Sequence, residues 1–130
     1  MKKHITIISD ELLFWNLIIP LLKSKMRDIQ INVCNSFQEI DEKLNPKFCD
    51  LVLIDGGLTD MSSIEVIQFI RLKKNILSPI WFFPEIQIKA YIYKAYQMGA
   101  SRIINKPFDP YWVTNQIVSM LDKQSYKLAV

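Results

Sequence analysis

The stretch Leu51-Val52-Leu53-Ile54-Asp55-Gly56-Gly57 indicates the fold class more clearly than any other part of the chain. Its first four residues are all apolar, which is typical of a central parallel strand that is buried on both faces. The run stops at Asp55, and the two glycines that follow it favour a turn. We therefore predict a buried strand with an aspartate at its carboxyl end.

Strand-like and helix-like segments alternate on both sides of this stretch. Further strands are predicted at residues 5–8, 29–34, 79–83 and 102–105. Helices are predicted at residues 11–26, 36–45, 62–74, 87–98 and from 109 onward, and capping-box patterns mark the starts at Ser36 and Ser62. Strict alternation predicts an α/β fold, a doubly wound five-stranded parallel sheet with five helices and right-handed crossovers.

The helix predicted at residues 11–26 combines a broad apolar face with an interior proline. The apolar face is assigned to Leu12, Leu13, Trp15, Ile19 and Leu22. Pro20 removes a backbone donor and crowds the carbonyl four residues before it. We therefore expect the helix to kink or to end early at this residue.

Composition and length describe an ordinary globular domain. The chain has 130 residues, of which 50% are apolar and 22% are charged, so one fold can bury roughly two-thirds of the unfolded surface. We expect a single domain over residues 1–130, with an ordered core at about 3–122. Cys34 and Cys49 fit no paired metal or redox spacing, so we interpret them as reduced thiols and predict no zinc site.

Charge and hydropathy do not indicate nucleic acid or membrane as partners. The net charge is +3, but lysines and arginines are scattered between acidic residues, so direct nucleic-acid binding is not expected. The apolar stretch at residues 5–8 ends too early for a secretory signal, and no run approaches the roughly 18 apolar residues of a membrane span. We therefore expect a cytoplasmic protein without membrane contact.

Polar residues follow four of the predicted strands. In a doubly wound sheet, ligands bind outside the carboxyl ends of the strands, so these residues are the candidates for a site. They are Ser9-Asp10-Glu11, Asp55-Gly56-Gly57, Pro84-Glu85 and Lys106-Pro107.

These motifs, in this order and spacing, resemble the receiver domain of bacterial two-component response regulators. The resemblance covers essentially the whole chain. It rests on Asp10-Glu11 after the first strand, on Asp55 with Met61 and Ser63 downstream, and on Gly99-Ala100-Ser101 leading to Lys106-Pro107-Phe108. The last motif, Gly-Ala-Ser-x-x-x-x-Lys-Pro-Phe, is the most specific. The resemblance implies the flavodoxin-like receiver fold.

The resemblance also implies a role for each residue of the candidate site. Asp55 would accept a phosphoryl group, and Lys106 would be the catalytic lysine that contacts the phosphoryl oxygens. Gly56 would bring its backbone donor close to the phosphoryl group, since it has no side chain. Mg²⁺ would be held by Asp10, Asp55 and the backbone carbonyl of Gly57. A cis bond is expected between Lys106 and Pro107.

Four residues depart from the family pattern. Ser9 stands where a second acid is usual, which leaves one fewer negative charge for the metal. Pro84 replaces the usual hydroxyl residue after the fourth strand, and Ile103 replaces an aromatic residue in the fifth strand. We therefore expect phosphorylation to be poorly coupled to the rest of the domain. Glu85 places a further carboxylate beside an incoming phosphate.

The leading interpretation is a stand-alone receiver domain that acts on protein partners and is not an enzyme beyond self-catalysed transfer and dephosphorylation. The implied partners are a histidine kinase or phosphotransfer protein and a downstream protein. The usual output face corresponds to Ala90, Tyr91, Tyr93, Lys94, Ile103 and Trp112, although these aromatic residues can equally well serve only to cover the sheet.

Two alternatives stay open. One is a pseudo-receiver that works through protein contacts without phosphorylation. The other is a small flavodoxin-like protein that binds a nucleotide or flavin. The second is disfavoured because no glycine-rich loop follows the first strand, where Asp10 and Glu11 would repel a phosphate.

Overall fold

The structure of the protein, a computed structural model, describes the backbone of residues 2–129 and the side chains of residues 2–122. Its strands are β1 (Lys3–Ile8), β2 (Ile29–Cys34), β3 (Leu51–Asp55), β4 (Ile80–Phe83) and β5 (Arg102–Ile103). Its helices are α1 (Leu12–Lys25), α2 (Phe37–Lys43), α3 (Ser63–Leu72), α4 (Lys89–Met98) and α5 (Pro110–Ala129), with a short 3-10 helix at Pro46–Phe48. The predicted alternation of strands and helices is confirmed.

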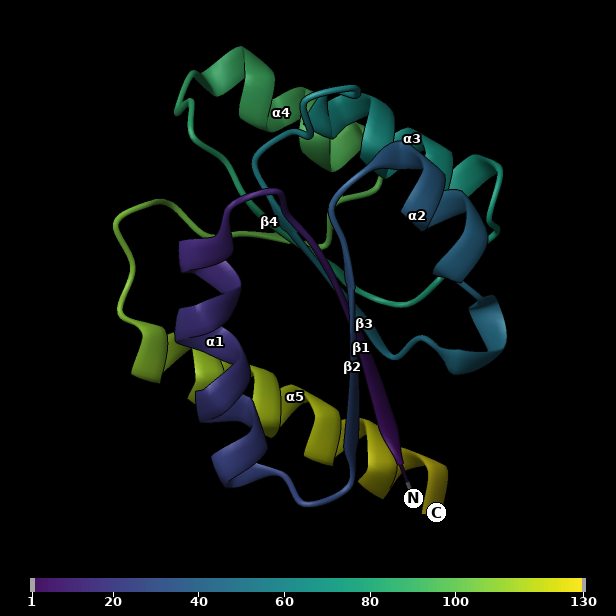
Figure 1. The fold of residues 1–130 in the computed structure, drawn as a ribbon, viewed down its shortest axis with the longest axis vertical. Coiled ribbons are helices and arrows are strands. Elements are labelled where there is room, and N and C mark those ends of the chain that lie inside the picture. The colour runs from purple at the N-terminus through teal and green to yellow at the C-terminus, as the bar shows by residue number, and fades with distance from the viewer. Residues whose placement is uncertain (1, 130) are drawn as a thin grey trace.

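The five strands form one parallel sheet in the order β2-β1-β3-β4-β5. Figure 1 shows the sheet edge-on, with α1 and α5 on one side and α2, α3 and α4 on the other. β3 lies at the centre of the sheet, and all five of its residues are buried, as its apolar sequence predicts. Ile8 of β1 is in register with Ile54, and Asp55 is in register with Phe83 of β4. The carboxyl ends of these three strands therefore lie level with one another.

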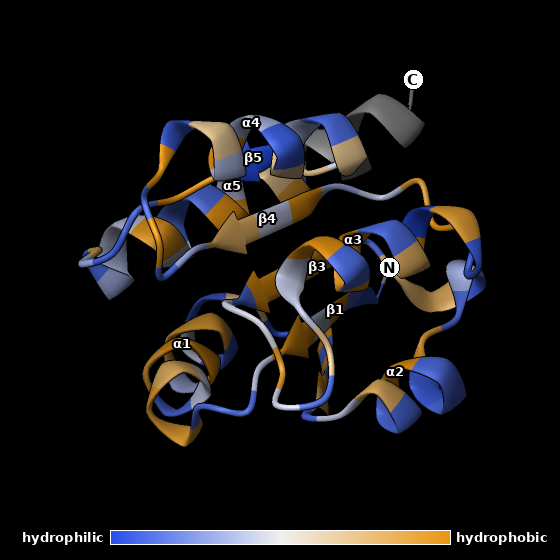
Figure 2. Cartoon of the chain, turned by 90° about the horizontal axis from the view of Figure 1, so that it is seen from above, coloured by the Kyte–Doolittle hydropathy of each residue, from blue (hydrophilic) through white to orange (hydrophobic). Residues whose placement is uncertain are grey.

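Helices cover both faces of the sheet, and each face has its own apolar core. On one face, Ile5, Leu53 and Phe83 pack with residues of α1 and α5. On the other, Ile54 and Phe82 pack with residues of α2, α3 and α4. Figure 2 shows β1, β3 and β4 as largely apolar strands and α1 as a helix with apolar residues around most of its circumference. In the described part of the chain, no helix is both long enough and apolar enough to cross a membrane.

The predicted helix starts are confirmed by their hydrogen bonds. The Ser36 hydroxyl accepts from the amide of Glu39 at 3.3 Å, and the Ser62 hydroxyl accepts from that of Glu65 at 3.3 Å. The Asp109 carboxylate accepts from the amide of Tyr111 at 2.9 Å. Each side chain satisfies a backbone donor that the first turn of a helix leaves free.

Gly99 ends α4 and lies against a guanidinium from α3. Its φ of 124° belongs to the region that favours glycine. The carbonyl of Gly99 accepts from Nη2 of Arg71 at 2.8 Å, and Nη1 of Arg71 donates to the carbonyls of Ile76 and Ser78 at 2.8 and 2.7 Å. One side chain thus holds together the loop before β4 and the loop before β5.

The apolar face predicted for α1 is partly wrong. Phe14, Ile18 and Leu22 are the buried residues of this helix, whereas Leu12 and Leu13 are 64% and 69% exposed. The helix has apolar residues around most of its circumference, so its sequence does not show which side will face the sheet. The positions of the sheet and of α5 determine which side of α1 is buried.

The early end predicted at Pro20 is also wrong, because α1 continues through this residue to Lys25. Pro20 and Asn16, whose carbonyl loses its hydrogen bond to the missing amide, both lie on the exposed side of the helix. Water can satisfy this carbonyl. Ile18 and Leu22, on the opposite side, remain buried and hold the helix on the sheet.

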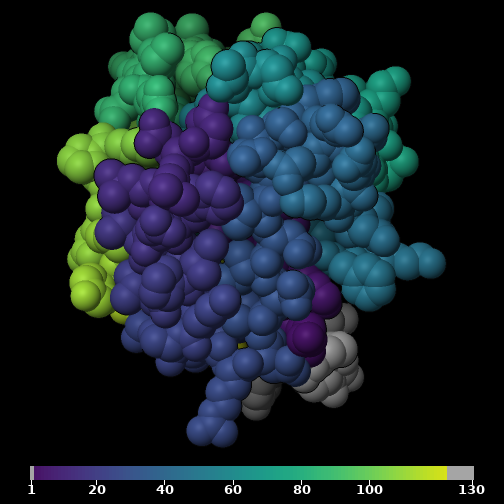
Figure 3. Space-filling view, in the orientation of Figure 1, coloured from purple at the N-terminus to yellow at the C-terminus, as the bar shows by residue number. Residues whose placement is uncertain are grey.

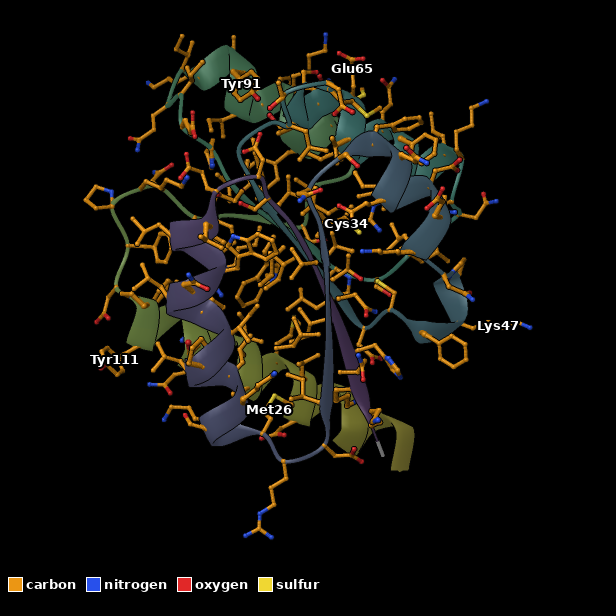
Figure 4. The ribbon with its side chains drawn as sticks, viewed as in Figure 1. Met26, Cys34, Lys47, Glu65, Tyr91 and Tyr111 are labelled. Atoms are coloured by element: carbon orange, nitrogen blue, oxygen red, sulfur yellow. The ribbon has the colours of Figure 1, made fainter. Side chains whose placement is uncertain are left out.

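Both cysteines are free thiols in the core that lies under α2 and α3. Figure 4 shows Cys34 inside the molecule, between the sheet and these helices. Burial raises the pKa of Cys34 to about 11 and that of Cys49 to about 11. Both are therefore protonated at neutral pH and act as small apolar residues.

Candidate functional site

Asp55 is the centre of the candidate site. It is the last residue of β3, between β1 and β4, and its side chain has no exposed surface. A carboxylate removed from water is costly unless charged or polar partners compensate it. Asp55 has two such partners, one at each of its oxygens.

Lys106 is the first partner, and its ammonium forms an ion pair with Oδ1 of Asp55. The lysine lies in the loop between β5 and α5 and keeps 29% of its side chain exposed. The bond between Lys106 and Pro107 is cis, as the resemblance implies. The structure therefore brings together two residues that lie 51 positions apart in the sequence.

Ser9 is the second partner, and its direct contact with Asp55 was not expected from the sequence. The buried Ser9 hydroxyl donates to Oδ2 of Asp55 at 2.9 Å. The same hydroxyl accepts from the amide of Glu11 at 3.0 Å, so its orientation is fixed from both sides. The sequence had indicated only that an acid is missing here, because the contact depends on the pairing of β1 with β3.

Asp10 lies beside this centre but does not bond to it. Its exposed carboxylate accepts from the hydroxyl of Thr59 at 2.9 Å, and Thr59 belongs to the loop between β3 and α3. In the described residues no group of three or more His, Cys, Asp or Glu side chains is placed to hold a metal. Asp10, Asp55 and the carbonyl of Gly57 nevertheless provide oxygen atoms at neighbouring strand ends, and oxygen atoms are the ligands that Mg²⁺ prefers.

Gly56 has a φ of 60°, which favours glycine, and its amide donates to the carbonyl of Phe83 at 3.0 Å. In this structure that amide is therefore already used within the sheet. A Cβ at Gly56 would lie 3.2 Å from Oε1 of Glu85, so the Glu85 carboxylate covers this glycine. The Glu85 side chain thus occupies the space that a side chain at residue 56 would fill.

A cavity of about 200 Å³ opens beside Asp55. Its polar wall carries Glu11, Asp55, Glu85 and Lys106. Its apolar wall carries Leu13, Phe14 and Leu17 of α1, together with Phe108. The rings of Phe14 and Phe108 pack edge to face, with centroids 5.7 Å apart, which joins α1 to the β5–α5 loop. Figure 3 shows the start of α1 (purple) beside this loop (yellow-green) at one edge of the molecule.

Two of the positions that depart from the family pattern, Pro84 and Ile103, are apolar. Pro84 is buried and Ile103 is half-buried, and neither offers a hydroxyl. A different hydroxyl contact occurs nearby, between Ser63 at the start of α3 and Tyr91 of α4. The Tyr91 ring also lies 6.1 Å from the ring of Phe82 in β4 (Figure 4 labels Tyr91).

The residues assigned to an output face are mostly exposed. Tyr93 is 65% exposed and Trp112 is 44% exposed. Ala90 and Lys94 are exposed as well, whereas Tyr91 and Ile103 are half-buried. The guanidinium of Arg102 lies over the rings of Trp81 and Trp112, 4.9 and 5.1 Å from their centroids. These contacts account for part of the aromatic surface without any partner.

A family model described as the response regulator receiver domain matches residues 5–119. The chain belongs to this family. The receiver domain takes part in two-component signalling, and phosphorylation and Mg²⁺ are typical of its members. Membership also implies interaction with a kinase or a downstream partner.

Similar proteins agree with this assignment. The receiver domain is 28% identical over 111 residues to the transcriptional regulatory protein CrdR of Helicobacter pylori, which matches 84% of this chain and 50% of that protein. The chain thus spans about half the length of this curated relative.

Solved receiver structures share the fold. A CheY-like receiver domain protein from Methanospirillum hungatei superposes with a TM-score of 0.79 at 20% identity and covers 98% of this chain and 99% of its own. A two-component response regulator from Clostridium difficile gives a TM-score of 0.80 at 20% identity, covering 95% and 98%. The flavodoxin-like receiver fold predicted from the sequence is confirmed.

Proposed function

We propose that this receiver domain accepts a phosphoryl group on Asp55 and signals through protein contacts. The observation that carries the proposal is the buried Asp55 carboxylate, paired with Lys106 at the wall of a cavity. Phosphoryl transfer needs chiefly a positioned nucleophile and charges that stabilise the transferring oxygens. Asp55 supplies the nucleophile and Lys106 supplies a charge beside it.

In the transfer step, Oδ1 of Asp55 attacks the phosphorus of the donor. A new O–P bond forms while the bond between phosphorus and the leaving group breaks, and the leaving group keeps the electron pair. Lys106 contacts Oδ1 before the step and is close enough to follow the charge onto the phosphoryl oxygens. The Ser9 hydroxyl holds Oδ2, so the carboxylate keeps its orientation.

Mg²⁺ is the cofactor that this proposal includes. It would be held by Asp10, Asp55 and the carbonyl of Gly57, and it would neutralise charge on the phosphoryl oxygens. The partners that we propose are a histidine kinase or phosphotransfer protein as donor and a downstream protein as target, with neither membrane nor direct nucleic-acid contact.

The test is incubation with acetyl phosphate and Mg²⁺, followed by intact-mass measurement of wild type and Asp55→Asn. We expect one phosphoryl group on the wild type and none on the variant. Equal labelling of both proteins would remove Asp55 from the acceptor role.

A phosphorylation-independent interaction module is the second candidate, and the position of Glu85 favours it. The Glu85 carboxylate lies over Gly56, where the phosphoryl group would come. Absence of labelling, combined with binding of a partner by both wild type and Asp55→Asn, would support this candidate. A nucleotide or flavin is disfavoured further, because a cavity of about 200 Å³ is smaller than most sites for such ligands.

A further inference from the structure

Glu85 is an acidic residue of the cavity that the proposed transfer does not use, and its carboxylate lies close to Gly56. It is the second residue after β4, next to the buried Pro84, and it is exposed at the start of the loop that leads to α4. Its carboxylate oxygen Oε1 would lie 3.2 Å from a Cβ built on Gly56, the residue that follows Asp55. The carboxylate therefore faces the cavity from above Gly56.

The charges that line this cavity are mostly negative. Glu11, Asp55 and Glu85 face a single cation, Lys106. Lys106 is paired with Asp55, and among the described side chains neither Glu11 nor Glu85 has an ion-pair partner. The entrance to Asp55 thus carries negative charge that no neighbouring side chain neutralises.

A phosphoryl group that approaches Asp55 is repelled by the carboxylates of Glu11 and Glu85. To bond to Oδ1 of Asp55 and to contact Lys106, it enters the cavity that these two residues line together with Glu85. The opposite wall is apolar, with Leu13, Phe14 and Leu17 lining it, so it offers no cation that could offset the repulsion. The electrostatic cost grows with the negative charge of the donor.

We propose that Glu85 is a specificity-determining residue of this site, one that disfavours free dianionic phosphodonors. This inference rests on the proposed function and deepens it. The step itself is the transfer described above, in which an O–P bond to Asp55 forms and the donor loses its phosphoryl group. Glu85 takes no part in the bonds that change and acts only through its charge.

The same charge favours donors of another kind. A phosphoryl group on a protein side chain can arrive with basic residues beside it, and these offset the carboxylates of Glu11 and Glu85. The substrate class that the cavity fits is therefore a phosphorylated protein with positive charge next to its phosphoryl group, in preference to a small free phosphate ester or anhydride.

The experiment compares two small donors on wild type, Glu85→Gln and Glu42→Gln. Acetyl phosphate is a dianion at neutral pH and phosphoramidate is a monoanion. Glu85→Gln removes the charge and keeps the size of the side chain. Glu42→Gln is the matched control, because it makes the same change on α2, at an exposed residue that does not line the cavity. Initial rates of labelling are measured by intact mass with Mg²⁺ present.

We expect Glu85→Gln to speed labelling by acetyl phosphate about 10-fold and labelling by phosphoramidate about 3-fold, since repulsion scales with the donor's charge. Glu42→Gln should match wild type with both donors. Added salt should reduce the gain, because mobile ions screen the repulsion.

Equal rates for Glu85→Gln and wild type would overturn the inference while leaving the acceptor role of Asp55 intact. Equal gains with both donors would also overturn it, because they would indicate a steric effect or a change in folding. No labelling of any protein by either donor would overturn the proposed function itself, and this inference with it.

Discussion

At the scale of single residues, Ser9 is where this receiver domain departs most directly from its family. The hydroxyl replaces a carboxylate and contacts Oδ2 of Asp55 at 2.9 Å. A serine can orient its neighbour through a hydrogen bond, but it brings no charge to a cation. The site therefore keeps the geometry of Asp55 while it loses part of its attraction for a metal.

We predict that Ser9→Asp tightens Mg²⁺ binding by about tenfold or more, since it restores a negative charge next to Asp55. Ser9→Asn, which has nearly the same shape without the charge, serves as the control and should show no gain. Isothermal titration calorimetry with MgCl₂ measures both. An unchanged or weaker affinity in Ser9→Asp would place Ser9 outside the metal pocket.

The two buried thiols predict a loss of stability at alkaline pH. Burial raises the folded-state pKa of Cys34 and of Cys49 to about 11, whereas the ordinary value is 9.0. Below pH 9.0 both thiols keep their protons in the folded and the unfolded chain. As the pH rises from 9.0 toward 11, only the unfolded chain releases them, so the free energy of unfolding falls by about 2 kcal/mol for each thiol.

Urea unfolding at a series of pH values measures this fall. Other groups also titrate in the same range, so the comparison is with a variant that carries Cys34→Ala and Cys49→Ala. The variant should start less stable and should lose less stability between pH 9.0 and 11. Parallel curves for the two proteins would show that the thiols do not ionise on unfolding as expected.

At the scale of secondary-structure elements, α1 keeps a proline that its geometry does not need. Pro20 lies in the interior of the helix and is exposed, so it contributes little to packing. We predict that Pro20→Ala raises the free energy of unfolding by about 1–2 kcal/mol, because an amide becomes available to the carbonyl of Asn16 and the proline ring no longer crowds it. Chemical denaturation measures the change, and a loss of stability would contradict it.

The elements show what local sequence can and cannot predict. Helix starts at Ser36, Ser62 and Asp109 were predicted because a cap and the amide it binds lie within a few residues of each other. The central strand was predicted because four consecutive apolar residues need burial on both faces. In each of these cases, all the residues that determine the structure lie within one short stretch of the chain.

Other features were missed because they depend on distant segments. The buried side of α1 is set by the sheet and α5, so Leu12 and Leu13 were wrongly placed in the core. The bond between Ser9 and Asp55 joins residues 46 positions apart, and that between Ser63 and Tyr91 joins residues 28 apart. The motif around Lys106 predicted its approach to Asp55 only through the family resemblance.

At the scale of the whole molecule, phosphorylation of Asp55 can signal through α4 only if it changes the conformation of that helix. Pro84 offers no hydroxyl that could contact a phosphoryl group, and Ile103 has no polar end that could move between solvent and core. A ligand shifts a conformational equilibrium only if it contacts the two states differently. We therefore predict that beryllofluoride, a mimic of the phosphoryl group, leaves amide exchange of residues 87–98 and the oligomeric state nearly unchanged when it binds.

Hydrogen exchange with mass spectrometry, together with size-exclusion chromatography, tests this prediction. New protection of α4 or dimerisation would contradict it. In that case the hydroxyl contact between Ser63 and Tyr91 is the route to examine, because it joins the start of α3 to α4. Tyr91→Phe would then abolish the new protection while beryllofluoride still binds.

The contacts of Arg71 with the loops before β4 and β5 limit how this sequence can diverge. A Cβ at Gly99 would lie 2.7 Å from Cγ of Arg71, and the carbonyl of Gly99 is held by the same guanidinium. A side chain at residue 99 would both strain the backbone and displace the arginine from three carbonyls. The residue at position 71 therefore limits which residues can occur at position 99. A side chain at residue 99 would need Arg71 to be replaced or displaced first, so the order in which substitutions accumulate is constrained.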